Sequence, residues 1–342
     1  MKVLLGMSGG VDSSATAVCL QNAGYECIGA TMVMHGECDS EGVSDAKAVA
    51  EALNMDFHVF DVRDEFRRWV MDEFVRSYLE GETPNPCIVC NKTLKFGLFA
   101  DRATELGAEM IATGHYARVE KYGDRYLLKK GKDPKKDQSY VLYNLGQSVL
   151  SRLILPLGAM DKSEVRELAI EASLKNAERK ESQDICFVPD GDYVGFIERY
   201  TGAFSPEGDF VLRDGKVMGR HKGIIRYTIG QHKKLGLGIH TPLYVLEKDA
   251  AANRIILGSN EALFTRTVIA KDINWIADEA PDLPFRAAAK IRYKHVEQSA
   301  TVEDAGEGRV KVTFDEPQRA ATPGQAVVFY DGDTVIGGGT VV

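Results

Sequence analysis

Near its start the chain reads Gly6-Met7-Ser8-Gly9-Gly10-Val11-Asp12-Ser13-Ser14, directly after a short apolar run and directly before a helical pattern. Paired glycines let backbone N–H groups turn toward an anion, and the serine hydroxyls add further donors. The positive end of the following helix favours the same negative charge. This segment therefore predicts a strand, loop and helix in which residues 6–13 bind a pyrophosphate group.

The loop differs from two common phosphate-binding motifs. A Walker A loop, G-x-x-x-x-G-K-[ST], places a lysine near the terminal phosphates, and this loop has none. The dinucleotide pattern G-x-G-x-x-G is also absent. These differences argue against a kinase and against an NAD-dependent enzyme. A glycine-rich turn that binds nothing is an alternative, but the order of strand, loop and helix argues against it. We expect Asp12 to cap the helix and to help organise Mg²⁺-ATP.

The first 113 residues alternate apolar runs with amphipathic segments, as in a parallel sheet covered by helices. Gly24 and Gly107 fit the ends of two helices. The pattern predicts an α/β fold with a doubly wound parallel sheet. We expect strands at 2–7, 26–32, 56–60 and 110–113, and helices near 12–22, 44–53, 64–79 and 92–106.

The rest of the chain changes in character twice. Residues 138–201 are expected to be mainly helical, with Asp161 or Ser163 as a cap before 164–172. After Pro206, short alternating runs predict strands at 243–246, 254–257, 287–292, 309–314 and 326–330. We therefore expect a nucleotide-binding domain at 1–137, a mainly helical or mixed part at 138–205, and a β-rich, tRNA-binding region at 206–342 that ends in a small barrel.

The composition limits the class of protein. With 342 residues and 44% hydrophobic content, the chain can form two or three packed domains. Its first apolar run is too short for a signal peptide or a membrane span, so we expect a cytoplasmic protein with no membrane partner. The net charge of -8 argues against indiscriminate binding to nucleic acid. Basic patches lie at 129–136 and 220–234, and each by itself is expected to be a solvated loop.

The cysteines fall into two groups. Cys87 and Cys90 lie in a proline-braced loop ahead of a helix, where the helix N-terminus and Lys92 should lower a thiol pKa. Cys186 lies in another irregular segment much later in the chain. A closed zinc site needs four ligands, so zinc is less favoured for these three. We assign no role to the others, Cys19, Cys27 and Cys38.

The glycine-paired loop resembles that of the ATP pyrophosphatases, in which the loop holds pyrophosphate while a substrate oxygen takes the AMP. The whole chain resembles the tRNA-specific 2-thiouridylases, which thiolate the wobble uridine of tRNA. The motifs that carry this resemblance are residues 6–13, Pro84-Asn85-Pro86, Cys90-Asn91-Lys92, Thr113-Gly114-His115-Tyr116-Ala117-Arg118, Asp137-Gln138-Ser139-Tyr140, Tyr227-Thr228-Ile229-Gly230-Gln231 and Thr322-Pro323-Gly324-Gln325.

The resemblance implies a tRNA-uridine 2-sulfurtransferase with an adenine nucleotide alpha hydrolase-like domain. It implies that Cys186 receives sulfur as a persulfide from a sulfur-carrier protein, and that Cys90 releases the sulfur, so that the pair ends as a disulfide. Met32 and Gly114 would join residues 6–13 around ATP and Mg²⁺. The residues that would meet the target base or the tRNA are Asn85, Pro86, Cys87, His115, Lys136, Asp137, Gln138, Arg292, Tyr293 and Gln325.

Three alternatives stay open. Some members of this family carry an aspartate where this chain has Cys87, which argues against a base role for that position. Cys87, Cys90 and Cys186 would then hold a [4Fe-4S] cluster with one iron open to sulfide. An ATP pyrophosphatase that forms an amide or a guanidine would need neither Cys90 nor Cys186. A tRNA-binding or nucleotide-sensing protein without catalysis is the third, and the intact loop and cysteines argue against it.

Overall fold

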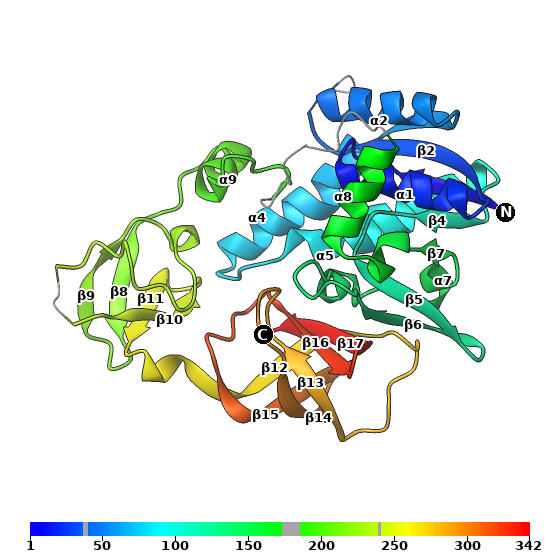
Figure 1. The fold of residues 1–342 in the computed structure, drawn as a ribbon. Coiled ribbons are helices and arrows are strands. Elements are labelled where there is room, and N and C mark those ends of the chain that lie inside the picture. The colour runs from blue at the N-terminus through cyan, green and yellow to red at the C-terminus, as the bar shows by residue number, and fades with distance from the viewer. Residues whose placement is uncertain (37–39, 173–184, 239–240) are drawn as a thin grey trace.

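A computed structural model describes residues 1–36, 40–172, 185–238 and 241–342 of the chain (Figure 1). Its N-terminal part is a parallel sheet with the strand order β3-β2-β1-β4-β7. The strands are β1 (Lys2–Gly6), β2 (Glu26–Val33), β3 (Asp56–Asp61), β4 (Met110–Ala112) and β7 (Leu153–Ile154). The chain runs outward from β1 to β3 and then returns to β4 on the other side of β1. The carboxyl ends of β1 and β4 therefore form a switch point, where open α/β sheets bind ligands.

Helices cover both faces of this sheet because β1 is apolar on both sides. Val3 and Leu5 pack with α1 (Val11–Asn22), α2 (Glu41–Ala52) and α8 (Lys162–Glu171). Leu4 packs on the opposite face with η2 (Asn91–Leu98) and α6 (Phe99–Glu105). A strand buried on both faces reads as a continuous apolar run, as this one does.

Two long helices contain π-helical turns. The first combines α3 (Arg63–Phe66), η1 (Arg67–Met71) and α4 (Asp72–Leu79), and the second combines α5 (Pro86–Cys90), η2 and α6. The second helix begins six residues before the predicted start at residue 92, so that part of the prediction was wrong. Asn85 is the N-cap and Pro86 occupies the first helical position, where its missing N–H costs no hydrogen bond.

A hairpin that the sequence analysis did not identify links the parallel sheet to the C-terminal barrel. It comprises β5 (Ala117–Tyr122) and β6 (Arg125–Lys130), and Lys129 pairs with Thr334 of β17 (Thr334–Val341). The barrel has the order β12-β15-β14-β13-β16-β17 and is closed by pairing of β12 with β17, which confirms the expected barrel. Its other strands are β12 (Phe264–Trp275), β13 (Phe285–Lys290), β14 (Gln298–Gly306), β15 (Arg309–Arg319) and β16 (Ala326–Asp331).

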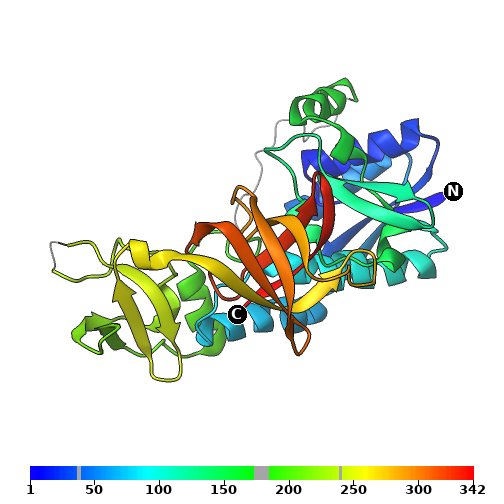
Figure 2. The same ribbon diagram turned by 90° about the horizontal axis from the view of Figure 1, so that it is seen from below.

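A separate β-rich lobe lies between α9 (Tyr193–Thr201) and the barrel in sequence. Its sheet has the order β10-β11-β8-β9, and in both views it lies at the opposite end of the molecule from the parallel sheet (Figures 1 and 2). Phe74 of α4 and Phe210 of β8 belong to one buried cluster, so the lobe packs against the α4 helix. The lobe strands are β8 (Gly208–Leu212), β9 (Val217–His221), β10 (Tyr244–Asp249) and β11 (Arg254–Gly258).

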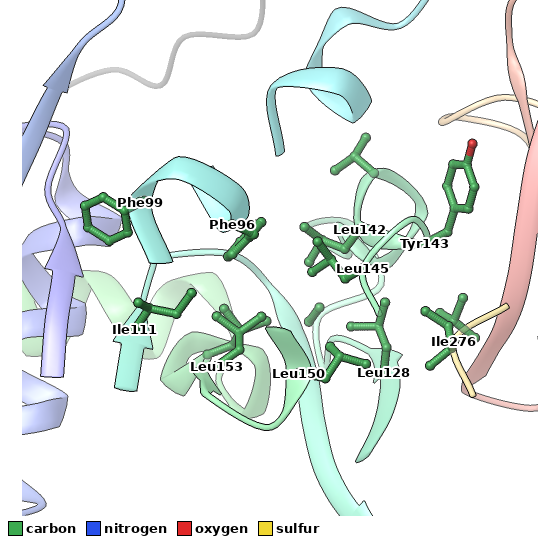
Figure 3. Close-up of a cluster of buried hydrophobic side chains, with 14 of the residues drawn as sticks. Phe96, Phe99, Ile111, Leu128, Leu142, Tyr143, Leu145, Leu150, Leu153 and Ile276 are labelled. Atoms are coloured by element: carbon green, nitrogen blue, oxygen red, sulfur yellow. The ribbon is translucent and has the colours of Figure 1, made fainter. Parts of the chain in front are cut away.

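A continuous apolar core joins the parallel sheet to the barrel (Figure 3). Phe99 and Ile111 come from the α/β layers, Leu128 comes from β6, and Ile276 follows β12. Each is at most 3% exposed. Replacing one such large side chain by alanine typically costs about 2–5 kcal/mol of stability. This shared core fixes the position of the barrel against the sheet.

Most of the predicted elements of the first 113 residues are confirmed. The four predicted strands correspond to β1, β2, β3 and β4. Gly24 and Gly107 follow α1 and α6 with φ values of 81° and 68°, as expected for helix ends. Asp161 begins α8 through a capping box with Glu164. The domain boundaries after 137 and 205 stay a prediction, and Cys38 lies outside the described residues. Within the described part of the chain, no helix is long and apolar enough to cross a membrane.

Candidate active site

Serine side chains hold the loop after β1 in its turn. Ser13 Oγ accepts a hydrogen bond from Ser8 N at 3.2 Å and donates one to Gly10 O at 3.0 Å. Ser14 Oγ also donates to Gly10 O at 3.0 Å. The turn leads directly into α1, which begins at Val11. The loop conformation is therefore preorganised, and the positive end of α1 lies at the loop.

Two glycines let neighbouring backbone segments approach this loop. Gly9 has a φ of 74°, and a Cβ atom there would collide with the carbonyl oxygen of Gly42 in α2. Gly114 follows β4, and a Cβ atom there would lie 3.0 Å from Asp12 C and 3.1 Å from Ser13 N. The glycines thus allow α2, β4 and the loop to meet around one opening.

A cavity of about 480 Å³ opens at the switch point, a size that suits a nucleotide-sized ligand. Its lining includes ten of the predicted site residues, namely Gly6, Met7, Ser8, Asp12, Ser13, Met32, Gly114, His115, Gln138 and Cys186. Gly9, Gly10 and Val11 belong to the loop but do not line the cavity. The structure therefore brings the predicted ATP loop and one predicted sulfur-carrying thiol to the same cavity.

Asp12 is held by two residues that the sequence analysis did not single out for this contact. Its Oδ1 atom accepts hydrogen bonds from Lys162 Nζ at 2.6 Å and from Tyr116 Oη at 2.7 Å. The N-cap of α1 is Gly10, without a side-chain cap hydrogen bond, so the predicted capping role of Asp12 was wrong. The carboxylate instead ties the loop to α8 and to the segment after β4.

Cys87 and Cys90 lie on a helix and not in a loop. Asn85 Oδ1 accepts a hydrogen bond from Cys87 N at 3.1 Å, which caps α5. The two thiols are three residues apart and so share one face of the helix. Cys87 is exposed, whereas Cys90 is 6% exposed and its Sγ lies 3.8 Å from Met34 Sδ.

The predicted lowering of the thiol pKa was wrong for Cys90. Burial, together with the neighbouring charges of Cys186 and Cys87, raises the pKa of Cys90 to about 11. Cys186 is exposed as a residue, but its thiol faces the cavity lining, where partial desolvation raises its pKa as well. The charges of Cys87 and Cys186 therefore both act on the buried Cys90 thiol. The cation that lowers the pKa of both thiols is Lys95, not the predicted Lys92.

His115 and Gln138 take part in the wall of the cavity. Desolvation and the positive charge of Lys95 lower the pKa of His115 to about 3, so its imidazole is neutral at pH 7. Its Nδ1 atom lies 2.8 Å from Thr113 Oγ1. Gln138 Oε1 accepts a hydrogen bond from Tyr116 N at 2.9 Å. A neutral imidazole at this position cannot act as a phosphate-binding cation.

Residues 137 and 293 connect the barrel to this site. Tyr293 Oη donates a hydrogen bond to Asp137 O at 3.1 Å. Burial raises the pKa of Tyr293, and the charges of Asp137 and Cys87 act in the same direction. The Asp137 carboxylate accepts hydrogen bonds from Gly131 N and from Ser139 N and Oγ, so it closes a turn of its own segment. Arg292 donates a hydrogen bond to Arg319 O at 3.4 Å. The segment that follows β13 thus approaches the thiols from the barrel side.

Gln325 fastens the barrel to the segment before Asn85. Its Nε2 atom donates a hydrogen bond to Thr83 O at 2.6 Å, and Thr83 N donates one to Pro323 O at 2.9 Å. A Cβ atom at Gly324 would lie 3.0 Å from Thr83 N. The resemblance assigns Gln325 to tRNA binding. Its side chain also holds the barrel against the segment that contains Thr83.

Both basic patches are partly neutralised by acidic residues. In the first, Lys129 pairs with Glu120 at 3.0 Å and Lys130 pairs with Glu297 at 2.7 Å. Lys136, the patch residue assigned to tRNA, donates its backbone N–H to Asp133 O. In the second patch, Arg226 pairs with Glu198 at 2.6 Å and Arg220 pairs with Asp209 at 3.2 Å. These pairs reduce the positive charge that each patch offers to a phosphate backbone.

The described residues contain no site for a single metal ion. Among residues 1–36, 40–172, 185–238 and 241–342, no group of three His, Cys, Asp or Glu side chains could hold one. A [4Fe-4S] cluster holds its cysteine sulfurs further apart than a single ion does, so a cluster on Cys87, Cys90 and Cys186 stays a prediction.

A parallel sheet with a serine- and glycine-rich loop at its switch point defines a nucleotide-binding domain of the adenine nucleotide alpha hydrolase class. Family models agree with the three structural parts. They are described as the tRNA methyl transferase HUP domain, matching residues 1–190, the tRNA methyl transferase PRC-barrel domain, matching 194–259, and the Aminomethyltransferase beta-barrel domain, matching 265–341. The chain belongs to the family of tRNA-specific 2-thiouridylases, as its motifs predicted.

Relatives of the chain match it over nearly its whole length. A tRNA-specific 2-thiouridylase from Clostridium botulinum (strain Loch Maree / Type A3) is 46% identical over 99% of this chain and 99% of its own. One from Clostridioides difficile (strain 630) is 45% identical over 99% of this chain and 98% of its own. A solved complex of a 4-thiouridine synthetase with RNA and bound ATP is 21% identical, covers 58% of this chain and 50% of that chain, and has a TM-score of 0.39. That distant similarity adds nothing to the family assignment.

Proposed function

We propose that this chain replaces the C2 oxygen of the wobble uridine of tRNA with sulfur in an ATP-dependent reaction. The observation that supports this proposal is the position of Cys186, which lines the same cavity as Ser8 and Ser13 of the nucleotide loop. A thiol beside an ATP-binding loop can deliver sulfur to a carbon that ATP has activated. An amide- or guanidine-forming ATP pyrophosphatase would not need that thiol, so that alternative is less favoured.

The first step is adenylation of the base. The uridine O2 atom attacks the α-phosphorus of ATP, the bond to the bridging oxygen breaks, and pyrophosphate leaves with the electron pair. Backbone N–H groups of the loop and the N-terminus of α1 would hold the pyrophosphate as its charge develops. The product is an O2-adenylated uridine from which AMP can be displaced.

The second step transfers sulfur. The terminal sulfur of a persulfide on Cys186 attacks C2, and the C–O bond breaks as AMP leaves. Cys90 then attacks Cys186 Sγ, the bond from Cys186 to the transferred sulfur breaks, and the sulfur stays on C2 as a thiocarbonyl. The transferred sulfur is reduced while the Cys90 thiol is oxidised, and Cys186 Sγ exchanges its bond to that sulfur for the bond of a Cys90–Cys186 disulfide. An external thiol would reduce the disulfide, and a sulfur-carrier protein would restore the persulfide.

ATP would bring Mg²⁺ on its phosphate oxygens. Among the described residues that line the cavity, Asp12 is the one that carries a carboxylate. Its Oδ1 atom accepts both of the side-chain hydrogen bonds described above. Its Oδ2 atom is therefore the protein oxygen that would complete the coordination of the metal ion. One carboxylate together with phosphate oxygens is a usual ligand set for Mg²⁺.

The uridine would have to leave the base stack, because a stacked base does not expose C2 to a sulfur nucleophile. Asn85, Pro86 and Cys87 lie beside Cys90 at the start of α5 and would meet the extruded base. A second set of residues would contact the rest of the tRNA or hold the contacting residues in place. These are His115, Lys136, Asp137, Gln138, Arg292, Tyr293 and Gln325. We also propose that the reaction takes place in the cytoplasm, where tRNA is abundant.

A reconstituted thiolation reaction tests this proposal. The full chain is incubated with ATP, a tRNA transcript and a persulfide donor, and 2-thiouridine is quantified by nucleoside mass spectrometry. Cys186→Ser and Cys90→Ser should each lower 2-thiouridine formation at least about 100-fold. Cys186→Ser should still release pyrophosphate in the presence of tRNA, because adenylation does not use the thiol. Cys27→Ser is the matched control and should keep activity. A normal yield of 2-thiouridine from Cys186→Ser would show that this assignment is wrong.

A further inference from the structure

Lys95 is a cation of the candidate site that the family motifs do not assign. It lies in η2 and lines the cavity together with Ser8, Ser13 and Gly114. Among the described residues, no carboxylate forms an ion pair with Lys95. A lysine of this kind differs from surface lysines such as Lys132, which pairs with Asp161 and Glu164.

The fold brings Lys95 into the same site as the loop and the thiols. Lys95 follows Cys90 by five residues in one continuous helix, and it lines the same cavity as Cys186, Ser8 and Ser13. Its positive charge lowers the pKa of His115 and opposes the burial that raises the pKa of Cys90 and of Cys186. Lys95 is therefore a cation shared by the nucleotide loop and the thiols.

The charge balance of the cavity also singles out Lys95. The Asp12 carboxylate is compensated by Lys162, at 2.6 Å. His35 and His115 also line the cavity, and withdrawal from water lowers the pKa of both, so that both are neutral at pH 7. Within the part of the lining that the structure describes, Lys95 is thus the cation whose charge no neighbouring acid offsets. A nucleotide would bring several negative charges to this cavity.

We propose that Lys95 binds the α-phosphate of the nucleotide and of the adenylated base. The loop has no lysine of its own and would hold pyrophosphate through N–H and hydroxyl groups. The α-phosphorus is attacked by the base, and its AMP group is later displaced by sulfur, so the α-phosphate must lie between the loop and the thiols. Lys95 lines the cavity that the loop and Cys186 also line. This inference rests on the proposed thiolation reaction for the placement of the α-phosphate.

An ammonium group at this position has a direct chemical use. Negative charge grows on the α-phosphate oxygens as the uridine oxygen attacks, and it grows again as AMP leaves. A fixed cation stabilises both changes without solvent reorganisation. Because Lys95 would contact the phosphate and not the sulfur, its loss should weaken binding of ligands that contain the α-phosphate and spare those that lack it.

Ligand binding to the full chain, without tRNA or a sulfur donor, tests the inference. Isothermal titration calorimetry is carried out with AMP, adenosine and inorganic pyrophosphate as separate ligands, using competition against ATP where direct binding is weak. Lys95→Gln should weaken AMP binding at least about tenfold, as expected for the loss of a charge-assisted hydrogen bond. The same variant should bind adenosine and pyrophosphate like the wild type. Lys95→Arg should restore most of the AMP affinity.

Lys92→Gln is the matched control, because Lys92 lies in the same π-helical segment, is exposed and does not line the cavity. It should bind all three ligands normally. If Lys95→Gln does not fold by circular dichroism, Lys95→Met keeps the aliphatic stem and removes the charge. Unchanged AMP binding in a folded neutral variant would overturn the inference, and so would an equal loss of pyrophosphate binding. Absence of 2-thiouridine from the wild type would contradict the proposed function, whereas this binding series would still decide the role of Lys95.

Discussion

Lys162 Nζ lies 2.6 Å from Asp12 Oδ1, and this pair ties the first residue of α8 to the nucleotide loop across 150 positions of the chain. The two side chains are 10% and 32% exposed. Tyr116 Oη donates a hydrogen bond to the same carboxylate oxygen at 2.7 Å. The geometry of the loop therefore depends on segments that fold far from it in sequence.

Loss of the Lys162 charge should destabilise the protein. Lys162→Met leaves the Asp12 carboxylate in a partly desolvated place without its cation, and we expect the free energy of unfolding to fall by about 2 kcal/mol. Lys132→Met is the control, because Lys132 forms ion pairs that are about half exposed, which typically contribute at most about 1 kcal/mol. Urea denaturation of both variants measures the difference. Equal losses would show that the partly buried pair contributes no more to stability than the exposed ion pairs of Lys132.

A side chain at Gly114 should disturb the nucleotide site without unfolding the sheet. In Gly114→Ala the new Cβ atom would lie 3.0 Å from Asp12 C and 3.1 Å from Ser13 N, so the start of α1 must shift. We expect ATP binding to weaken by about tenfold, which corresponds to about 1.4 kcal/mol. Gly238→Ala is the control, because a Cβ atom there meets nothing within 4 Å. Calorimetric titration with ATP compares the two variants, and wild-type affinity in Gly114→Ala would argue against a close approach of β4 to the loop.

Alkylation of Cys90 should require high pH. With a pKa of about 11, only about one thousandth of the thiol is ionised at pH 8, and the thiolate is the reactive form. The rate with iodoacetamide should rise about tenfold per pH unit until the pH approaches that pKa. Peptide mass spectrometry follows the reaction, with the exposed Cys87 as the internal comparison. Labelling of Cys90 at pH 8 as fast as Cys87 would contradict the burial of its thiol.

The same pKa predicts a loss of stability in alkali. Because burial favours the neutral thiol, the folded state holds the proton of Cys90 more tightly than the unfolded chain, whose thiol has the ordinary value of 9.0. This contribution is complete below about pH 9 and is lost as the pH rises toward 11. Thermal melts of the wild type and Cys90→Ala between pH 8 and pH 10.5 should therefore converge as the pH rises, and parallel curves would argue against this effect. Cys87→Ala provides the comparison, because it removes an exposed thiol from the same helix.

Gln325 should act mainly through its contact with Thr83. Gln325→Glu replaces an N–H donor by a carboxylate that faces the Thr83 carbonyl oxygen, 2.6 Å away in the wild type. We expect easier proteolysis between the barrel and α5, and 2-thiouridine formation lowered about tenfold, with ATP binding unchanged. Gln298→Glu is the control. Within the described chain, the side chain of Gln298 forms one hydrogen bond, from Nε2 to the nearby Val296 O at 3.5 Å. A normal protease pattern with reduced tRNA affinity would instead indicate that Gln325 acts only on the RNA.

The local elements of this protein can be predicted from its sequence alone. The glycine-paired loop, the apolar strands around it and the capped start of α8 follow from residues that are neighbours in the chain. Their backbone preferences and apolar spacing act over a few residues, so they can be recognised without a fold. The motifs were also sufficient to indicate the family, because they recur in a fixed order along the whole chain.

The electrostatics of the candidate site depend on contacts that only the folded molecule makes. Helical spacing could not show that Lys95, rather than Lys92, influences Cys90 and Cys186, and the motif around Asp12 could not show that Lys162 holds it. The hairpin of β5 and β6 could not be assigned to the barrel, because it pairs with a strand near the end of the chain. Burial, the proximity of charges and long-range strand pairing arise only when distant segments pack together. The pKa of Cys90 and the partners of Asp12 are therefore set only in the folded molecule.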